Sequence, residues 1–176
     1  MNHKKHLRYV LKIRKNMKKI IVVSDSHGNL QAIENLMPLI AENDYLIHLG
    51  DGAGDLRQVW KEYPDKIYQC RGNCDGFSPT PHEGILEVEQ IRIFYCHGDL
   101  YGVKSDLLEL AKEAKKRDCE IALYGHTHRA QITEIDGVTL INPGSMWRKV
   151  GEGGSYCYLV VNKDKFTAVI VGEQYM

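Results

Sequence analysis

Apolar residues in the first half of the chain alternate between continuous runs and helical spacing. The stretch 18–24 (KKIIVVS) is continuous and rich in β-branched residues, which is typical of a buried strand. Within 30–40 the apolar residues recur at helical spacing, and Pro38 is expected to kink or shorten that helix. The predicted elements are a strand at 18–24, a helix at 30–40, a strand at 45–50, a helix at 55–63 and a strand at 66–71. This alternation indicates parallel strands joined by right-handed crossovers.

After a loop rich in proline and glycine at 76–84, the pattern is dominated by strands. The stretch 84–98 resembles a hairpin, and Asp136-Gly137 is typical of a hairpin turn. The other predicted elements are a helix at 107–114 and strands at 120–125, 131–135, 138–142, 155–161 and 166–171. The whole pattern favours one α/β domain with a mixed, strand-rich second half.

The net charge of zero conceals an uneven distribution of charge. Residues 1–19 contain eight Lys/Arg and no acid, so the remaining chain carries 15 basic and 23 acidic residues. A body this acidic is atypical of proteins that bind the phosphate backbone, so no nucleic-acid partner is expected. Five cysteines without a CxxC pair argue against a disulfide framework and favour a cytoplasmic location. No apolar run approaches the roughly 18–20 residues of a membrane span, and no membrane partner is expected.

Residues 1–16 form a basic N-terminal extension that is set apart from a domain predicted to span 17–176. This extension lacks the apolar core of a secretory signal, and Met17 would be a natural start for the following MKKIIVVSDSHGN. Two interpretations stay open, a dispensable extension or a basic anchor for a surface.

Acidic, amide and imidazole side chains follow the predicted strands, almost always beside a glycine. Ligand crevices form at the carboxyl ends of strands in open α/β sheets, so these side chains are expected to meet. Asp25 and His27 are two residues apart and point the same way in extended chain. Mixed carboxylate and imidazole ligands suit Mn, Fe, Ni, Co or Zn better than Ca or Mg. The seven candidates, a number suited to two ions that share a carboxylate, are Asp25, His27, Asp51, Asn73, His97, His126 and His128.

The order DxH…GD…GNxD…H…GHxH resembles the calcineurin-like metallophosphoesterases. SDSHGN, RGNCD, CHGD, GHTH and INPGS are similar to the small prokaryotic phosphodiesterases of that family, from about residue 18 to the C-terminus. The resemblance implies an α/β fold in which a two-sheet β-sandwich is flanked by helices. It also implies that two divalent ions, Mn²⁺ first or else Ni²⁺, Co²⁺, Fe²⁺ or Zn²⁺, are bound per chain.

Carried over by position, the resemblance assigns a role to each candidate. Asp51 would bridge the two ions, and together with Asn73 and His97 it forms the predicted catalytic set. The first ion would be held by Asp25, His27 and His128, and the second by Asn73, His97 and His126. Weaker candidates for contacting the substrate or orienting a ligand are Cys74, Asp75, Asp99 and Arg148.

Cys74 departs from the wider family, in which many members have a histidine there that acts as acid to the leaving group. A thiol, with a reference pKa of about 8.5, is a poor analogue of an imidazolium. Cys74 is therefore expected to line the site, and the alternative is that its thiol donates the proton.

The implied function is hydrolysis of a small phosphoester, most simply a phosphodiester. A hydroxide that bridges two metals would attack phosphorus in line with the leaving oxygen, without a covalent enzyme intermediate. The alternative is a scaffold without turnover, as in the retromer subunit of the same fold. Retention of all seven ligands argues for the enzyme, and the sequence leaves open whether the chain forms a homo-oligomer.

Overall fold

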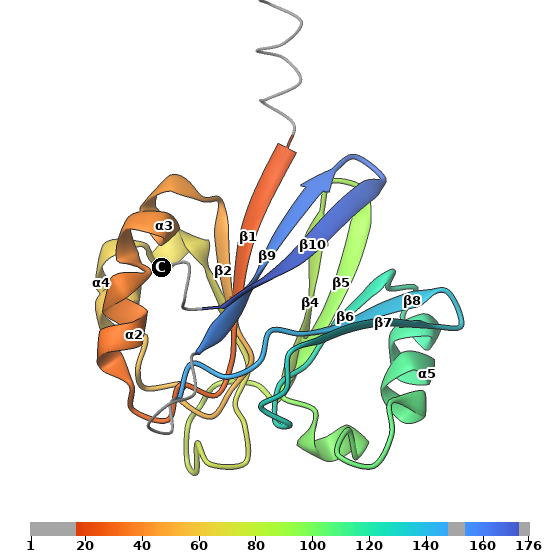
Figure 1. Cartoon of the computed structure of the whole chain (residues 1–176), viewed down its shortest axis with the longest axis horizontal. Helices are drawn as coiled ribbons and strands as arrows, with labels where there is room; N and C mark the ends of the chain where they lie inside the picture. Colours follow the sequence, from red (N-terminus) through yellow and green to blue (C-terminus); the bar gives the residue numbers. More distant parts are fainter. Residues whose placement is uncertain (1–16, 148–153, 173–176) are drawn as a thin grey trace, which may run out of the picture.

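The fold consists of two five-stranded sheets that face each other, with helices on their outer sides (Figure 1). The computed structural model describes residues 17–147 and 154–172. The predictions for residues 1–16 and for Arg148 lie outside this part of the chain. The predicted α/β sandwich flanked by helices is confirmed.

The first sheet has the order β10-β9-β1-β2-β3 and contains the predicted parallel arrangement. Strands β1 and β2 are parallel, and so are β2 and β3, whereas β9 pairs antiparallel with both β1 and β10. The strands are β1 (Met17–Val23), β2 (Tyr45–His48), β3 (Ile67–Gln69), β9 (Ser155–Asn162) and β10 (Lys165–Gly172).

The second sheet has the order β4-β5-β6-β8-β7. Its β4–β5 and β7–β8 pairs are the two predicted hairpins, and β6 lies parallel to both β5 and β8. The strands are β4 (Glu83–Val88), β5 (Ile91–Cys96), β6 (Ile121–Leu123), β7 (Gln131–Ile135) and β8 (Val138–Asn142).

The helices cover the outer face of each sheet. Helices α2, α3 and α4 lie on the first sheet, and α5 lies on the second (Figure 1). Pro38 divides the predicted first helix in two, because it occupies the first turn of α3, where its missing N–H costs no hydrogen bond. The helices are α2 (Leu30–Asn35), α3 (Met37–Glu42), α4 (Arg57–Glu62) and α5 (Leu108–Lys116), with 3₁₀ turns η1 (Pro64–Lys66) and η2 (Asp99–Tyr101).

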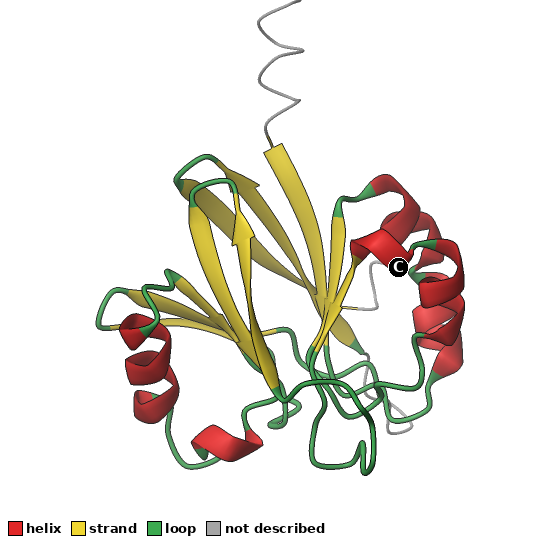
Figure 2. Cartoon of the chain, turned by 180° about the vertical axis from the view of Figure 1, so that it is seen from behind, coloured by secondary structure: helices red, strands yellow, loops and turns green. Residues whose placement is uncertain are grey.

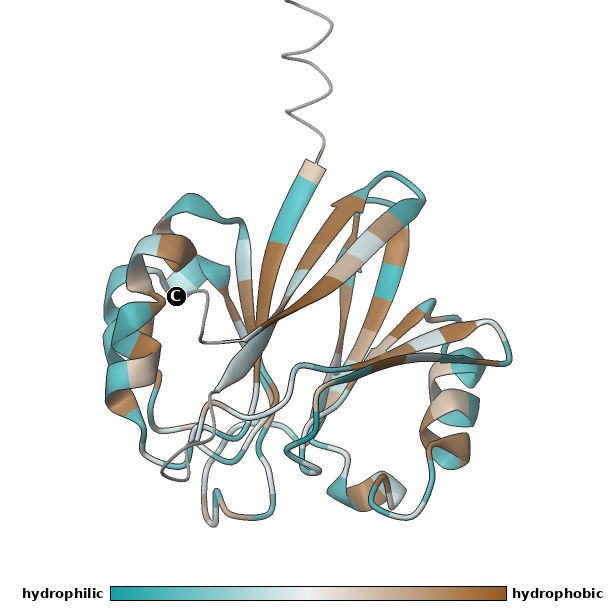
Figure 3. Cartoon of the chain, viewed as in Figure 1, coloured by the Kyte–Doolittle hydropathy of each residue, from teal (hydrophilic) through white to brown (hydrophobic). Residues whose placement is uncertain are grey.

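Strand β1 shows why its sequence is continuously apolar. Ile20 and Val22 belong to the core between the two sheets, whereas Ile21 and Val23 pack on the helix side with Ile33. Figure 3 shows the resulting pattern, with hydrophobic strands and polar residues on the helices. Both faces of the strand are therefore buried.

The cysteines of the described residues agree with one further expectation. All five cysteines are free, as predicted from their number and spacing. Among the described residues, no helix has the length and apolar character needed to cross a membrane.

Candidate metal centre

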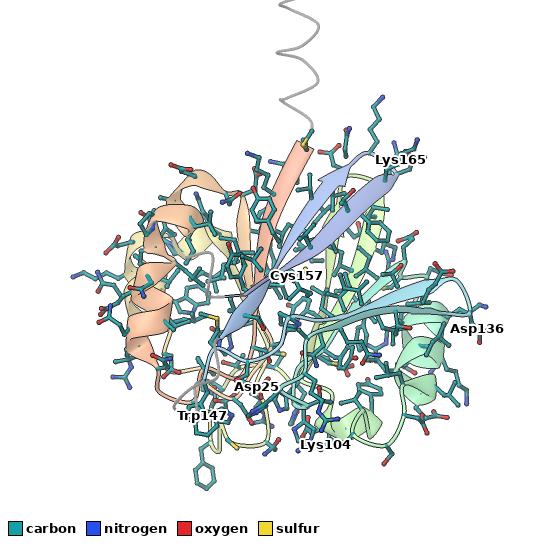
Figure 4. All side chains as sticks on the ribbon, in the orientation of Figure 1. Asp25, Lys104, Asp136, Trp147, Cys157 and Lys165 are labelled. Atoms are coloured by element: carbon teal, nitrogen blue, oxygen red, sulfur yellow. The ribbon has the colours of Figure 1, made fainter. Side chains whose placement is uncertain are left out.

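The seven candidate ligands lie in loops at one edge of the two sheets. Each loop follows a strand of a parallel pair: β1, β2 and β3 in the first sheet, and β5 and β6 in the second. Carboxyl ends of parallel strands meet at one edge, and the loops gather there (Figure 2). Asp25 is labelled at this end of the molecule, and Lys165 at the opposite end (Figure 4).

Backbone conformation in these loops is unusual. Asp25, His27, Asp51, His126 and His128 all have positive φ, between 45° and 65°. Non-glycine residues rarely occupy this left-handed region, and strained residues cluster at functional sites. Five of the seven predicted ligands adopt this conformation, and four other non-glycine residues, Glu89, Asp118, Asp136 and Lys163, adopt it elsewhere in the described chain.

One group of donor atoms forms around Asp25. Its Oδ1 lies 3.1 Å from His128 Nε2 and 3.8 Å from His27 Nε2. The two imidazole nitrogens are 3.3 Å apart. The structure thus brings together the three residues that were predicted to hold the first ion.

A second group forms around His97, at the end of β5. Its Nε2 lies 3.0 Å from His126 Nδ1 and 3.2 Å from Asn73 Oδ1. Asp51 lies between the groups, with Oδ2 3.5 Å from His97 Nε2 and 3.8 Å from His27 Nε2. The predicted bridging residue is thus the one that faces both groups.

The Asp25 carboxylate shows whether these residues fit a cation. Its Oδ2 accepts hydrogen bonds from Ser24 Oγ at 2.5 Å and from the His126 N–H at 3.0 Å. Its Oδ1 is buried and makes no hydrogen bond, although it faces the imidazoles. A buried carboxylate oxygen without a donor is costly unless it meets a cation, so the arrangement fits a metal.

The His97 ring supports the same conclusion. Its Nδ1 lies 2.7 Å from the carbonyl oxygen of Leu49, which only accepts, so Nδ1 carries the proton. In the neutral ring Nε2 then presents a lone pair towards the oxygens of Asn73 and Asp51. Such a second hydrogen bond is how metal-binding histidines are oriented. Converging lone pairs of nitrogen and oxygen fit a first-row divalent ion.

Asp51 is held in its charged form by its surroundings. Burial alone would raise its pKa, but contacts with His97 and with the N–H of Cys74 outweigh burial and hold the pKa well below its usual range. The Cys74 N–H donates to Asp51 Oδ1 at 2.7 Å. Oδ1 is thereby fixed by the backbone, while Oδ2 is left facing the two histidine groups.

Asp75 connects two of the ligand loops, the one after β2 and the one after β3, by hydrogen bonds. Its carboxylate accepts hydrogen bonds from the backbone N–H groups of Asp51, Gly52, Ala53 and Gly72, at 2.7–2.9 Å. This arrangement agrees with the weak prediction that Asp75 orients a ligand.

We expect Asp75→Ala to lower the free energy of unfolding by more than about 2 kcal/mol, because four N–H groups lose their acceptor. Metal affinity should fall by about 10–100-fold, as is usual when a residue that orients ligands is removed. Thermal unfolding and metal titration would measure both effects. Asp65→Ala, at an exposed carboxylate in η1, is the control and should change neither. A wild-type metal affinity in Asp75→Ala would contradict this orienting role.

A chain of hydrogen bonds from His48 through Ser26 to Asp55 was not predicted from the sequence. The Gly50 N–H donates to His48 Nδ1 at 3.2 Å, so Nε2 carries the proton and donates to Ser26 Oγ at 3.0 Å. Ser26 Oγ in turn donates to Asp55 Oδ2 at 2.6 Å. His48 is completely buried. Asp55 was missed, and its sequence signal is only its place in the glycine-rich stretch 50–55.

The remaining weak candidates differ in their surroundings. Cys74 is exposed, and the neighbouring Asp51 carboxylate raises the pKa of its thiol. Asp99 begins η2 beside His97, and its side chain makes no hydrogen bond within the described residues. Trp147 was not one of these candidates; it is 40% exposed, and its ring lies 6.3 Å from those of His27 and His128.

A family model described as "Calcineurin-like phosphoesterase superfamily domain" matches residues 17–164. "Probable metallophosphoesterase YsnB" of Bacillus subtilis is 31% identical over 150 residues, which cover 84% of this chain and 87% of that protein. "Phosphodiesterase YfcE" of Escherichia coli is 27% identical over an alignment of 184 positions, gaps included, that covers 90% of this chain and 95% of that protein.

Solved structures share the fold. A structure from Streptococcus pneumoniae, described as a predicted phosphoesterase, superposes with a TM-score of 0.77 at 24% identity, over 90% of this chain and 91% of that one. Vps29 of Chaetomium thermophilum superposes with a TM-score of 0.72 at 18% identity, over 89% and 94% of the two chains. At these identities the structural likeness concerns the fold alone.

Proposed function

Because the chain belongs to the calcineurin-like phosphoesterase superfamily, we propose that it is a phosphodiesterase. In this proposal it works with two divalent cations, and Mn²⁺ is the preferred ion. The observation that carries the proposal is Asp51 Oδ2, which lies within 4 Å of a histidine nitrogen in each donor group. A carboxylate between two groups of N and O donors suits a dinuclear site. The substrate class is a small phosphodiester.

Two divalent cations would supply Lewis-acid activation of water and neutralise charge on the phosphoryl oxygens. The protein itself holds and orients the side chains that would bind these cations. Asp25 and Asp51 carry the negative charge of the site, and the Leu49 carbonyl fixes the ring of His97. Asp75 holds the Asp51 loop against the loop after β3. These contacts would hold Asp51 and His97 in place before substrate arrives, which keeps the cost of reorganisation low.

Cys74 is proposed to line the site without donating a proton to the leaving group. The thiol is adjacent to a carboxylate that raises its pKa, which makes it a weaker acid near neutral pH. Its Sγ accepts a hydrogen bond from Asn73 Nδ2 at 3.2 Å. The departing oxygen would then have to leave largely by virtue of its own low basicity.

We therefore expect the Mn²⁺-loaded protein to cleave bis(p-nitrophenyl) phosphate much faster than a dialkyl phosphate. General acid catalysis is typically worth about 10²–10⁴-fold, so the difference in kcat/KM should be large. Cys74→Ala should stay within a few-fold of wild type on both substrates. A loss beyond roughly 10²-fold with both metals bound would assign the thiol a role in the chemistry. Absence of hydrolysis of every ester tested would contradict the proposed function itself.

The second candidate is a protein-interaction scaffold, and it is favoured only by the structural likeness to Vps29, a protein named for vacuolar protein sorting. That likeness concerns the fold, while the relative at 31% identity is named a metallophosphoesterase. Turnover that depends on Asp51 would separate the two functions.

A further inference from the structure

We propose that a cavity beside the metal centre binds a second phosphate group of the substrate through Lys104 and Arg129. The proposal rests on the phosphodiesterase function and adds a class of substrate to it, a phosphodiester that carries another phosphate on one of its alcohols. Neither residue was a candidate from the sequence.

The cavity lies at the same end of the molecule as the metal centre (Figure 4). It has a volume of about 400 Å³ and is lined by Val103, Lys104, Thr127, Arg129 and Gln131. Thr127 lies between two proposed metal ligands, His126 and His128. In Figure 4, Lys104 lies at the same end of the molecule as Asp25. A substrate whose scissile phosphate is at the metals would therefore have the cavity next to it.

The wall of the cavity is held in place by hydrogen bonds. Thr127 Oγ1 accepts from Asn142 Nδ2 at 3.1 Å and from the Arg129 N–H at 3.3 Å. Tyr124, buried at the end of β6, donates its hydroxyl hydrogen to Gln131 Oε1 at 3.2 Å. The loop that carries Arg129 is thus tied to β8 through Asn142, and the cavity has a fixed wall rather than a loose one.

The two cations are available for a ligand. Within the described residues, neither Lys104 nor Arg129 takes part in an ion pair, and both are exposed. By contrast, Arg117 is held by Glu83 and Glu113. Within the described residues, no carboxylate therefore competes with a ligand for these two side chains.

The residues that line the cavity have a net positive charge. Lys104 and Arg129 are charged, whereas Val103, Thr127 and Gln131 are neutral. The cavity therefore presents positive charge to a ligand.

The residue types favour phosphate as the occupant. The planar guanidinium of arginine can donate two parallel hydrogen bonds to a phosphate, and lysine adds a compact charge. Thr127 and Gln131 add polar side chains to the same lining. The place of the cavity at the same end of the molecule as the metal centre fits a second phosphate on the same substrate.

The test compares two chromogenic substrates, thymidine 5′-(p-nitrophenyl phosphate) with and without a 3′-phosphate. They share the scissile bond and leaving group and differ only in the remote phosphate. We expect wild-type protein loaded with Mn²⁺ to prefer the 3′-phosphorylated substrate by about 10-fold in kcat/KM, the size of a charge-assisted contact at a solvent-exposed site. In the double variant Lys104→Ala/Arg129→Ala this ratio should fall towards one. Lys165→Ala, at the opposite end of the molecule, is the matched control and should keep the wild-type ratio (Figure 4).

A second readout does not depend on turnover. Calorimetry with metal-loaded protein should show that thymidine 3′,5′-bisphosphate binds about 10-fold more tightly than thymidine 5′-monophosphate, and that the double variant loses this difference. An active wild type without either preference, or a preference that survives in the double variant, would overturn the cavity proposal and leave the phosphodiesterase function standing. If neither chromogenic substrate is hydrolysed, the function fails, and the binding comparison still decides for or against the cavity.

Discussion

Asp51→Asn is expected to lower kcat/KM for bis(p-nitrophenyl) phosphate more than any other single change among the seven proposed ligands. Oδ2 of Asp51 lies 3.8 Å from His27 Nε2 in one donor group and 3.5 Å from His97 Nε2 in the other. The asparagine side chain is neutral, and it would present either an N–H group or a single oxygen to the two donor groups. Loss of a residue that merely orients a ligand costs about 10–100-fold, so loss of a shared ligand should exceed 10²-fold.

The fold should survive this substitution. Asp51 follows the end of β2, and its Oδ1 accepts the Cys74 N–H, a bond that the amide oxygen of asparagine can still accept. Asp65→Asn is the matched control, because it removes an exposed carboxylate in η1 that is not among the candidate site residues. Circular dichroism and thermal unfolding would verify the fold, and metal analysis would verify occupancy. If Asp51→Asn hydrolyses the ester within a few-fold of wild type, the bridging assignment is wrong.

Much of the fold was predictable because its core follows simple patterns. Ile20 to Val23 are fully buried, two towards the other sheet and two towards the helices, and this is what a continuous apolar run indicates. The alternation of strands and helices likewise implied that β1, β2 and β3 run parallel. Parallel strands place their carboxyl ends together, so the meeting of the ligand loops followed from the same pattern.

The hydrogen bonds behind the ligands could not be predicted in the same way. Asp75 accepts from four backbone N–H groups whose directions depend on the positive φ of Asp51 and Gly52, and sequence spacing carries no such angle. Asp55 reaches Ser26 across 29 residues of sequence. These contacts depend on loop conformation, which local propensity specifies poorly.

The cavity at Lys104 and Arg129 could not be predicted from the sequence for a related reason. Arg129 directly follows the GHTH motif, but Lys104 comes from the segment after η2, 25 residues earlier. Each residue alone looks like an ordinary surface cation. Only the three-dimensional arrangement shows that both line one cavity beside the metal centre.

Removal of divalent metal is expected to abolish hydrolysis, and adding Mn²⁺, Ni²⁺ or Co²⁺ should restore it, with about two ions bound per chain. The donor atoms are imidazole nitrogens, carboxylates and the Asn73 amide oxygen, a mixture that suits first-row ions better than Ca²⁺ or Mg²⁺. Metal analysis of the dialysed, reloaded protein would give the stoichiometry. Bound metal should also raise the melting temperature, because an ion that binds only the folded state at about 100 times its Kd adds roughly 2.7 kcal/mol to stability.

Variants of the GHTH motif would show which of the two proposed ions each of its histidines binds. His128 approaches Asp25 at 3.1 Å, whereas His126 approaches His97 at 3.0 Å, so the two histidines serve different donor groups. His128→Ala and His126→Ala should therefore each bind about one ion instead of two, and each should lose activity. Combining both changes should leave a protein that binds neither ion firmly, because each group loses an imidazole. A wild-type protein that saturates with a single ion, or activity that resists chelation, would show that the dinuclear assignment is wrong.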